Sequence, residues 1–325
     1  MKHPVVLGAL ALALAAVGAT ASAAPRQSVV PPIFIKAVRA FDRPKFSGER
    51  VVEFQQGPNR RSHVEYVLHQ GLNSRVWFPL GSQFGRQVII ETANERLHYF
   101  PGRNEVEVLP PNREEAFIRL RNWIQKPGRA IRLTTGGIDR VAGRQTEIGI
   151  VSDPRGNVRQ RLWIDTQTGL ILKRELLDGV GMRVGYFEFT QIDYNPVIHP
   201  GDFLINVRGV TRITLVDKVR RLAQRNNFIE AMLASGHGFS LEGVNLVRPA
   251  GLVALHQSYS GPRGKLSLFQ VAGSVDLRSF QRDTNREVQF FGWESSGHSF
   301  ALVGAYSEAE LRSLAQLVGS NRNGL

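Results

Sequence analysis

The chain has 325 residues, of which 42% are hydrophobic and 21% charged, and its formal net charge is +13 at pH 7. This composition is typical of a folded globular protein and excludes a disordered or fibrous one. The sequence contains no cysteine, which excludes disulfides, thiolate metal sites and a cysteine nucleophile. Because 325 residues exceed what one hydrophobic core usually organises, we expect two domains.

The first 23 residues have the pattern of a secretory signal peptide. Lys2 and His3 form a basic start, an apolar run extends from Val5 to Val17, and Ala21-Ser22-Ala23 supplies small residues for cleavage. We expect cleavage after Ala23 and a soluble, exported mature chain without a transmembrane span. The alternative is an uncleaved anchor, but the apolar run is short beside the roughly 20 residues of a membrane-spanning helix.

Most of the 41 basic residues are arginines. For an exported protein this excess does not indicate nucleic acid, and we expect none as a partner. Arginine pairs bidentately with phosphate and carboxylate, so anionic lipid, lipopolysaccharide or an acidic peptide fits the excess better. The alternative is that a GC-rich genome encodes many arginines for no functional reason.

Residues 24–200 have the pattern of an α+β domain built on antiparallel strands. Apolar spacing over residues 33–41 predicts a helix, and a capping pattern at Asn112 predicts a second helix. A period of two predicts strands at residues 46–55, 62–70, 73–78, 86–92, 95–100, 104–109, 130–135, 138–152, 158–166, 169–177 and 182–194. So many consecutive strands predict a strongly curved half-barrel, with helices against its concave side.

The same strands predict which faces of the sheet meet solvent. Val64, Tyr66 and Leu68 share one face of their strand, and His63, Glu65 and His69 share the other, which we expect to be solvent-facing.

Residues 201–234 are expected to be a linker with an amphipathic helix, whose apolar face carries Leu215, Val219, Leu222, Ile229 and Leu233. Residues 235–325 are expected to form a smaller α+β domain with strands at 237–247, 251–260, 264–272, 286–293 and 298–304. A helix near Ser274 and a final helix, opened by a capping box of Ser307 and Glu310, complete this domain.

No catalytic or metal-binding pattern is found. The glycine-rich stretch Gly179–Gly185 lies between two expected strands, whereas a dinucleotide fingerprint needs a strand-to-helix turn. His63 and His69 lie about 20 Å apart along one strand, at roughly 3.3 Å per residue, and cannot share a metal. His298 beside Ser299 is read as two polar residues on a strand. We therefore expect no enzyme, no metal ion and no cofactor.

Two segments resemble the MucB/RseB family of periplasmic regulators of envelope-stress sigma factors. They are residues 137–144, which read GIDRVAGR, and residues 161–175, which read RLWIDTQTGLILKRE. A looser form of this strand pair is shared with LolA-like lipoprotein carriers. The hairpin of residues 259–269 is also similar to the family, although residues 260–264 replace its usual turn, and Ala305-Tyr306 replace its closing Val-Pro.

The resemblance implies a LolA-like first domain with a concavity that accepts lipid. It also implies a second domain that binds the periplasmic part of a membrane-bound anti-sigma factor. Misplaced lipid, lipoprotein or lipopolysaccharide is then expected to release that partner.

A curved sheet covered by helices would independently form a mostly apolar cleft. We expect its lining to come from Val52, Phe54, Val64, Tyr66, Leu68, Val76, Phe78, Val88 and Ile90, each of which could instead be ordinary core. An anionic group is expected to contact Arg220, Arg221 and Arg225, although a solvated helix face explains these arginines too.

Three functions compete on this sequence. The first is a non-enzymatic regulator that binds an anti-sigma factor through residues 235–325 and lipid through residues 24–200. The second is a periplasmic lipid or lipoprotein carrier, which has no evident need of the second domain. The third is an exported hydrolase, for which the sequence supplies no nucleophile and base.

Overall fold

The computed structural model describes residues 30–40, 45–56, 59–111, 121–122, 124, 131–234, 236–248, 251–275 and 288–320. The expected signal peptide, most of the helix expected from Asn112 and the body of the helix expected near Ser274 lie outside these residues.

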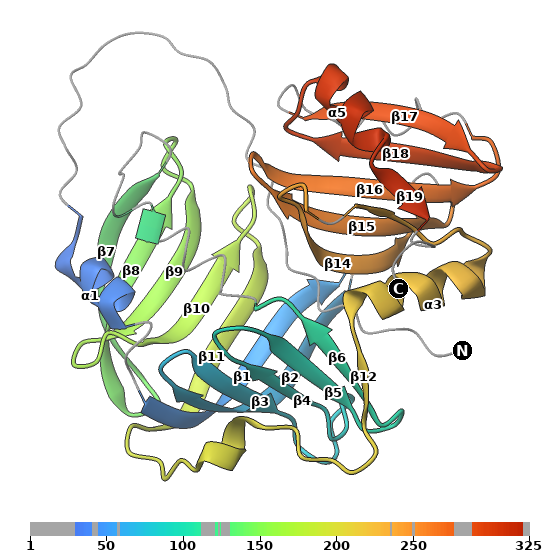
Figure 1. Ribbon diagram of the computed structural model, residues 1–325. Helices are drawn as coiled ribbons and strands as arrows, with labels where there is room; N and C mark the ends of the chain where they lie inside the picture. The colour runs from blue at the N-terminus through green and yellow to red at the C-terminus, as the bar shows by residue number, and fades with distance from the viewer. Residues whose placement is uncertain are drawn as a thin grey trace, which may run out of the picture.

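A curved sheet of twelve strands dominates the N-terminal part (Figure 1). Its order is β12-β6-β5-β4-β3-β2-β1-β11-β10-β9-β8-β7, and every pair except β12 with β6 is antiparallel. The first eleven strands are β1 (Lys45–Gln56), β2 (Asn59–Gln70), β3 (Asn73–Trp77), β4 (Val88–Glu91), β5 (Arg96–Phe100), β6 (Glu105–Leu109), β7 (Arg132–Val141), β8 (Arg144–Ser152), β9 (Val158–Asp165), β10 (Ile171–Leu177) and β11 (Arg183–Asp193). The expected α+β class and curved antiparallel sheet are confirmed.

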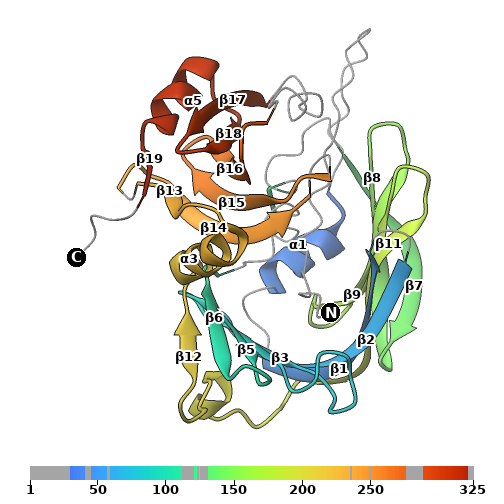
Figure 2. The same ribbon diagram turned by 90° about the vertical axis from the view of Figure 1, so that its right-hand side faces the viewer.

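Helix α1 (Pro32–Ala40) lies inside the curve of this sheet (Figure 2). Its buried face, which includes Ile33 and Phe34, packs against Leu162 and Ile164 of β9. Gly149 of β8 permits this approach, because a Cβ there would lie 2.7 Å from the Phe34 ring. The expected helix on the concave side is therefore confirmed.

The convex face is covered by the segment that follows β11. This segment contains the short 3-10 helix η1 (Pro200–Phe203). Phe203 is buried against Leu68 and Ile90, and the backbone oxygen of Asp202 accepts a hydrogen bond of 2.9 Å from Arg75. Both faces of the sheet are thus covered along part of its length.

The prediction of one strand over residues 138–152 was wrong. The turn lies at Ala142-Gly143, where both residues have positive φ, and it joins β7 to β8. Gly136-Gly137, which lie between the strands expected at residues 130–135 and 138–152, instead form an irregularity within β7. Glycine pairs suit bulges as well as turns, and the pattern alone does not separate the two.

The connection to the C-terminal part begins with β12 (Thr211–Ile213), which pairs in parallel with β6. Helix α3 (Leu215–Asn226) follows, opened by a capping box of Thr214 and Asp217. The helix ends at Asn227, which adopts the left-handed conformation with φ of 55°. The prediction that Ile229 and Leu233 continue its apolar face was therefore wrong, since the chain turns into β13.

The C-terminal part is a five-stranded antiparallel sheet with the order β14-β15-β16-β18-β17. The expected capping box of Ser307 and Glu310 opens its helix α5, and Leu311 of this helix is buried in the core. The elements are β13 (Ala231–Leu233), β14 (Ser240–Val247), β15 (Ala254–Gly261), β16 (Gly264–Ala272), β17 (Gln289–Ser295), β18 (His298–Gly304), α5 (Glu308–Ala315) and β19 (Val318–Ser320), with β13 and β19 paired.

Helix α3 lies between the two sheets (Figure 2). Its buried residues Leu215 and Val219 pack with Val244 of β14 and Leu255 of β15. In the described part of the chain, no helix has both the length and the apolar character needed to cross a membrane.

Candidate functional site

The strand register divides the nine expected lining residues between the two faces of the sheet. Val52 pairs with His63, and Val51 pairs with Val64, so the side chains of Val52 and Val64 lie on opposite faces. The concave face receives Val52, Phe54, Val76 and Phe78, and the convex face receives Val64, Tyr66, Leu68, Val88 and Ile90. The nine residues therefore do not line one cleft.

Three of the convex residues, Leu68, Val88 and Ile90, belong to the core beneath η1. Leu68 and Ile90 are buried there with Phe203, and Tyr66 packs its ring against that of Trp77 at 5.5 Å. These contacts assign them to folding, and a ligand in the concavity would meet only the other four.

The concave face carries a buried ionic cluster that the sequence did not reveal. Arg50 of β1 pairs with Glu65 of β2, and the Nε2 atom of His63 lies 3.4 Å from the Glu65 carboxylate. Burial raises the pKa of Glu65, but the charge of Arg50 and hydrogen bonds from His63 and Arg50 outweigh it and lower the pKa to about 2. Glu65 is therefore ionised at neutral pH.

Aromatic rings surround this cluster. The ring of His63 contacts those of Phe84, Phe78 and Phe54 at centroid distances of 4.6, 5.6 and 6.0 Å. The Arg50 guanidinium lies 5.2 Å from the ring centroid of Phe187 on β11. The Nδ1 atom of His63 is buried and, in the described part of the chain, has no hydrogen-bond partner.

The expectation of a solvent-facing side at His63 and Glu65 was therefore wrong. Glu65 is 7% exposed, because the loop between β3 and β4 brings Phe84 onto the His63 ring. Phe84 lies between the strands expected at residues 73–78 and 86–92, and the strand pattern gives no signal that this loop folds back over the sheet.

Chemically, the concave face combines aromatic walls, one balanced ion pair and one unsatisfied imidazole nitrogen. Such a surface suits a ligand with an apolar body and a polar group, and few polar contacts are needed to orient it. In the described residues, no three histidine or carboxylate side chains are grouped as metal ligands.

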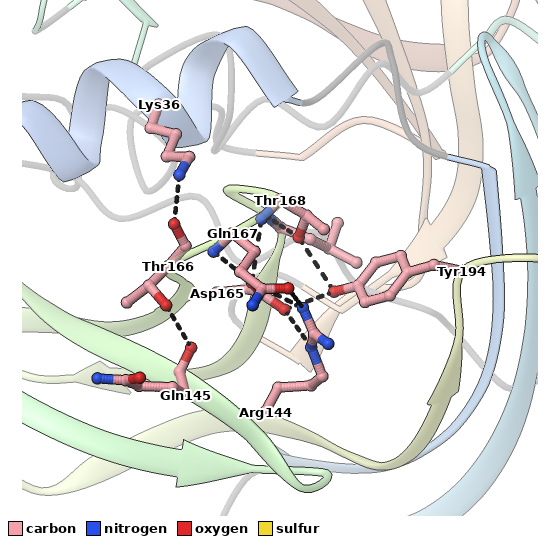
Figure 3. A network of polar contacts seen from close by, with 9 residues as sticks. Lys36, Arg144, Gln145, Asp165, Thr166, Gln167, Thr168 and Tyr194 are labelled. Atoms are coloured by element: carbon pink, nitrogen blue, oxygen red, sulfur yellow. Dashed lines mark hydrogen bonds and ion pairs between the residues drawn. The ribbon is translucent and has the colours of Figure 1, made fainter.

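A second buried carboxylate, Asp165, organises the turn between β9 and β10 (Figure 3). It accepts hydrogen bonds from Arg144 at 2.8 Å, from the Tyr194 hydroxyl at 3.0 Å and from the backbone N–H groups of Gln167 and Thr168. Burial raises the pKa of Asp165, but these bonds outweigh it and lower the pKa below its ordinary value. The Asp165 carboxylate is thus fully occupied by the chain itself.

The same turn holds α1 in place. The ammonium group of Lys36 donates to the Thr166 carbonyl, as Figure 3 shows. Gly169 has φ of 80°, and a Cβ there would lie 2.8 Å from the Lys36 carbonyl oxygen. The sequence segment 161–175 therefore builds the platform on which α1 sits inside the sheet.

The three linker arginines are not an isolated basic cluster. Arg221 pairs with Glu105 of β6 at 2.6 Å, and Arg220 lies 3.4 Å from both Asp217 and Glu230. Arg225 is exposed. The sequence around these arginines does not reveal Glu105, because that residue comes from a distant strand.

The family comparison concerns the larger part of the twelve-stranded sheet. Residues 85–207 match the model of the MucB/RseB N-terminal domain. Over these residues the chain is similar to that family. The matched segment extends from the loop before β4 to the residues after η1, and it contains the Asp165 turn. β1 and β2, which carry Arg50 and Glu65, precede the matched residues.

Solved MucB structures cover nearly all of this chain. The crystal structure of MucB is 16% identical and covers 88% of this chain and 96% of its own, with a TM-score of 0.44. The Pseudomonas aeruginosa MucA/MucB complex is 15% identical, with 89% and 98% covered and a TM-score of 0.44. A LolA superfamily protein from Nitrosomonas europaea is 12% identical, covers 53% of this chain and 98% of its own, and has a TM-score of 0.28. Among curated protein sequences, none matches significantly.

Proposed function

We propose that this protein is a non-enzymatic periplasmic regulator that binds the extracytoplasmic segment of a membrane-bound anti-sigma factor and senses lipid on its concave face. The observation that carries this proposal is the match of residues 85–207 to the model of the MucB/RseB N-terminal domain. Solved structures of MucB include complexes with MucA, which are similar to this chain over 89% of its length.

The proposed division of labour follows the two sheets. The C-terminal part, expected from residue 235 onward, binds the anti-sigma segment. The concave face binds an acyl chain through Val52, Phe54, Val76 and Phe78, beside the rings that surround His63. Lipid binding on this face lowers the affinity of the C-terminal part for the anti-sigma segment.

A shortened chain tests the division. A chain ending at Thr214 keeps the twelve-stranded sheet with β12. We expect it to bind a fluorescent fatty acid like the full chain and to lose binding of the anti-sigma segment encoded by a neighbouring gene. Retained binding of that segment would contradict the division. Fatty-acid binding by a full chain that binds no anti-sigma segment would favour a carrier.

A matched pair of substitutions tests the lipid face. Phe54→Ala removes a ring from the concave side, and we expect it to weaken fatty-acid binding about tenfold, because the lost contact area is worth on the order of 1–2 kcal/mol. Leu68→Ala removes a buried side chain from the convex side. It should lower stability and leave the affinity of the folded protein unchanged. Equal losses of affinity would exclude the concave face as the site.

A further inference from the structure

Several connections of the twelve-stranded sheet lie at one of its ends, among them those of the strand pairs β1–β2, β3–β4, β8–β9 and β10–β11. β1 pairs with β11 so that Phe54 meets Gly185, and β9 pairs with β10 so that Gln160 meets Leu176. The β1–β2, β8–β9 and β10–β11 turns therefore lie at the same end as the β3–β4 loop. We call this end the rim, defined as residues 59–62, 78–87, 153–157 and 178–183.

Contacts between neighbouring turns join three of the four rim segments. Arg61 donates to the Gln83 side chain at 3.4 Å, which joins the start of β2 to the β3–β4 loop. Arg60 donates to the Arg183 carbonyl at 3.3 Å, which joins β2 to the start of β11.

Apolar side chains stand at the tips of the rim. Val180 is 85% exposed, Leu80 is 76% exposed and Met182 is 61% exposed, which places them among the five most exposed large hydrophobic residues of the described chain. The β10–β11 tip has a fixed conformation, because the Asp178 carboxylate accepts from the backbone N–H groups of Val180 and Met182 at 3.0 and 2.8 Å. A well-formed turn thus presents apolar groups to water.

Positive charge surrounds these tips. Arg60, Arg61, Arg86 and Arg155 are exposed, and none of the four has an ion-pair partner among the described residues. By contrast, Arg183 pairs with Glu53 at 2.8 Å. The rim therefore interleaves unpaired arginines with exposed apolar residues.

We propose that the rim docks on the surface of an anionic lipid bilayer. Its arginines contact lipid phosphates, for which the guanidinium fork is suited, and Val180, Met182 and Leu80 enter the boundary between headgroups and acyl chains. An anionic bilayer fits the rim as a partner because the arginines complement its negative charge and the exposed apolar tips can enter it. Turns present no sheet edge or helical groove to an acidic peptide, whereas a bilayer accepts any group of protruding tips.

Vesicle sedimentation with the full mature chain tests the proposal. The probes are vesicles of phosphatidylethanolamine containing roughly a quarter phosphatidylglycerol, and vesicles of phosphatidylcholine alone. We expect binding to the first and little to the second. Replacing Arg60, Arg61 and Arg155 together by Gln should lower partitioning on the order of a hundredfold, at roughly fivefold per arginine. The double variant Val180→Ser, Met182→Ser should lower it roughly tenfold.

Matched controls carry the same chemistry elsewhere. Val197→Ser with Leu204→Ser removes two exposed apolar side chains of the convex side, and replacing Arg140, Arg208 and Arg248 by Gln removes three exposed charges away from the rim. Both controls should retain most of the binding to anionic vesicles. Circular dichroism and thermal unfolding establish that each variant is folded.

Three results would overturn the proposal: no binding of the unaltered chain to anionic vesicles, equal loss in rim and control variants, or binding insensitive to both rim variants. A reporter adds an independent measurement. Val180→Trp should show a blue-shifted emission on anionic vesicles and quenching by brominated lipid, and an unchanged emission would place the tip in water. Binding of the anti-sigma segment is measured on the same variants. Its absence would count against the proposed function alone.

Discussion

Asp165 and Glu65 are both buried carboxylates of the twelve-stranded sheet, and each pairs with an arginine of the neighbouring strand. Their surroundings differ. Asp165 accepts from Arg144, from Tyr194 and from two backbone N–H groups of its own turn. Glu65 meets Arg50 and His63 among aromatic rings, and the Nδ1 atom of His63 has no partner in the described chain.

This difference separates a fold-supporting site from a site with spare binding capacity. Where the chain itself uses every acceptor, the carboxylate fixes a local structure and has nothing left for a ligand. Where a buried polar atom stays unsatisfied beside apolar rings, a further partner can still lower the free energy. We therefore expect the two sites to respond differently to substitution and to acid.

The largest effect is expected at the saturated site. Asp165→Asn should lower the free energy of unfolding by about 3 kcal/mol, because the buried charge that holds Arg144 and the turn is lost. Urea unfolding followed by circular dichroism measures this. Asp178→Asn, in a more exposed turn, serves as the control, with an expected loss of about 1 kcal/mol. Similar losses at both positions would show that burial of Asp165 adds nothing.

At the Glu65 site, apolar side chains should be able to replace the ion pair with Arg50. Glu65→Gln should cost about 2 kcal/mol, since the half-buried Arg50 loses its partner. The double variant Arg50→Met, Glu65→Leu should recover most of this loss, because apolar side chains can fill a buried site that is already lined by rings. The matching double variant Arg144→Met, Asp165→Leu should recover little, because the turn N–H groups lose their acceptor. Recovery of stability in both double variants would show that the two carboxylate sites do not differ in this respect.

On lowering the pH, a third buried group, His98 of β5, should lose its contribution to stability before Glu65 does, because of their pKa values. Burial lowers the pKa of His98 to about 3, with help from the charges of Arg96, Arg103 and Lys218. Its neutral form stabilises the folded state fully above about pH 6.5, and this contribution is lost as the pH falls toward 3. We expect a loss of roughly 1–2 kcal/mol between pH 6.5 and 4.5, and His98→Gln should remove it.

Glu65 should respond only in stronger acid. Its pKa in the folded chain, about 2, is below the ordinary value of 4.5, so its ionised form contributes stability above about pH 4.5 and loses it as the pH falls toward 2. The stability difference between the unaltered chain and Glu65→Gln should therefore stay constant down to about pH 4.5 and then shrink. A difference that already changes near pH 6 would assign the titration to another group.

The smallest effect is expected where the Asp165 turn meets α1. Lys36→Met removes the hydrogen bond to Thr166 and should cost about 1 kcal/mol or less. Hydrogen exchange of the α1 amides should rise accordingly, with little change elsewhere in the sheet. Gly169→Ala is the stronger companion, because its Cβ would crowd the Lys36 carbonyl at a positive φ. Slower exchange in α1 for either variant would contradict this anchoring.

Local patterns in the sequence were sufficient to predict most strands and two helix starts. Alternation of apolar residues identified β1 and β2 because each strand has distinct faces, and the Ser307–Glu310 capping box marked the start of α5. The end of α3 was missed, because Ile229 and Leu233 keep a helical spacing although they follow the end of the helix and Leu233 lies in β13.

The membership of each face could not be predicted from alternation alone. Which residue of β2 shares a face with Val52 depends on the register across the β1–β2 turn, and a shift of one residue exchanges the faces. The observed register pairs Val52 with His63, so residues expected to line one cleft lie on both sides of the sheet. The burial of Glu65 depends on a loop contact with Phe84, which is equally a tertiary property.

The pairing of β12 with β6 has a mechanical consequence. The segment between the two sheets is bound as an edge strand, and Arg221 and Lys218 of the following helix are tied to Glu105 and Glu107 of the same β6. A large rotation of the C-terminal sheet therefore cannot occur as free swinging about a loose tether. A rotation of this sheet together with α3 would have to separate the three paired residues of β12 from β6 and break both ion pairs.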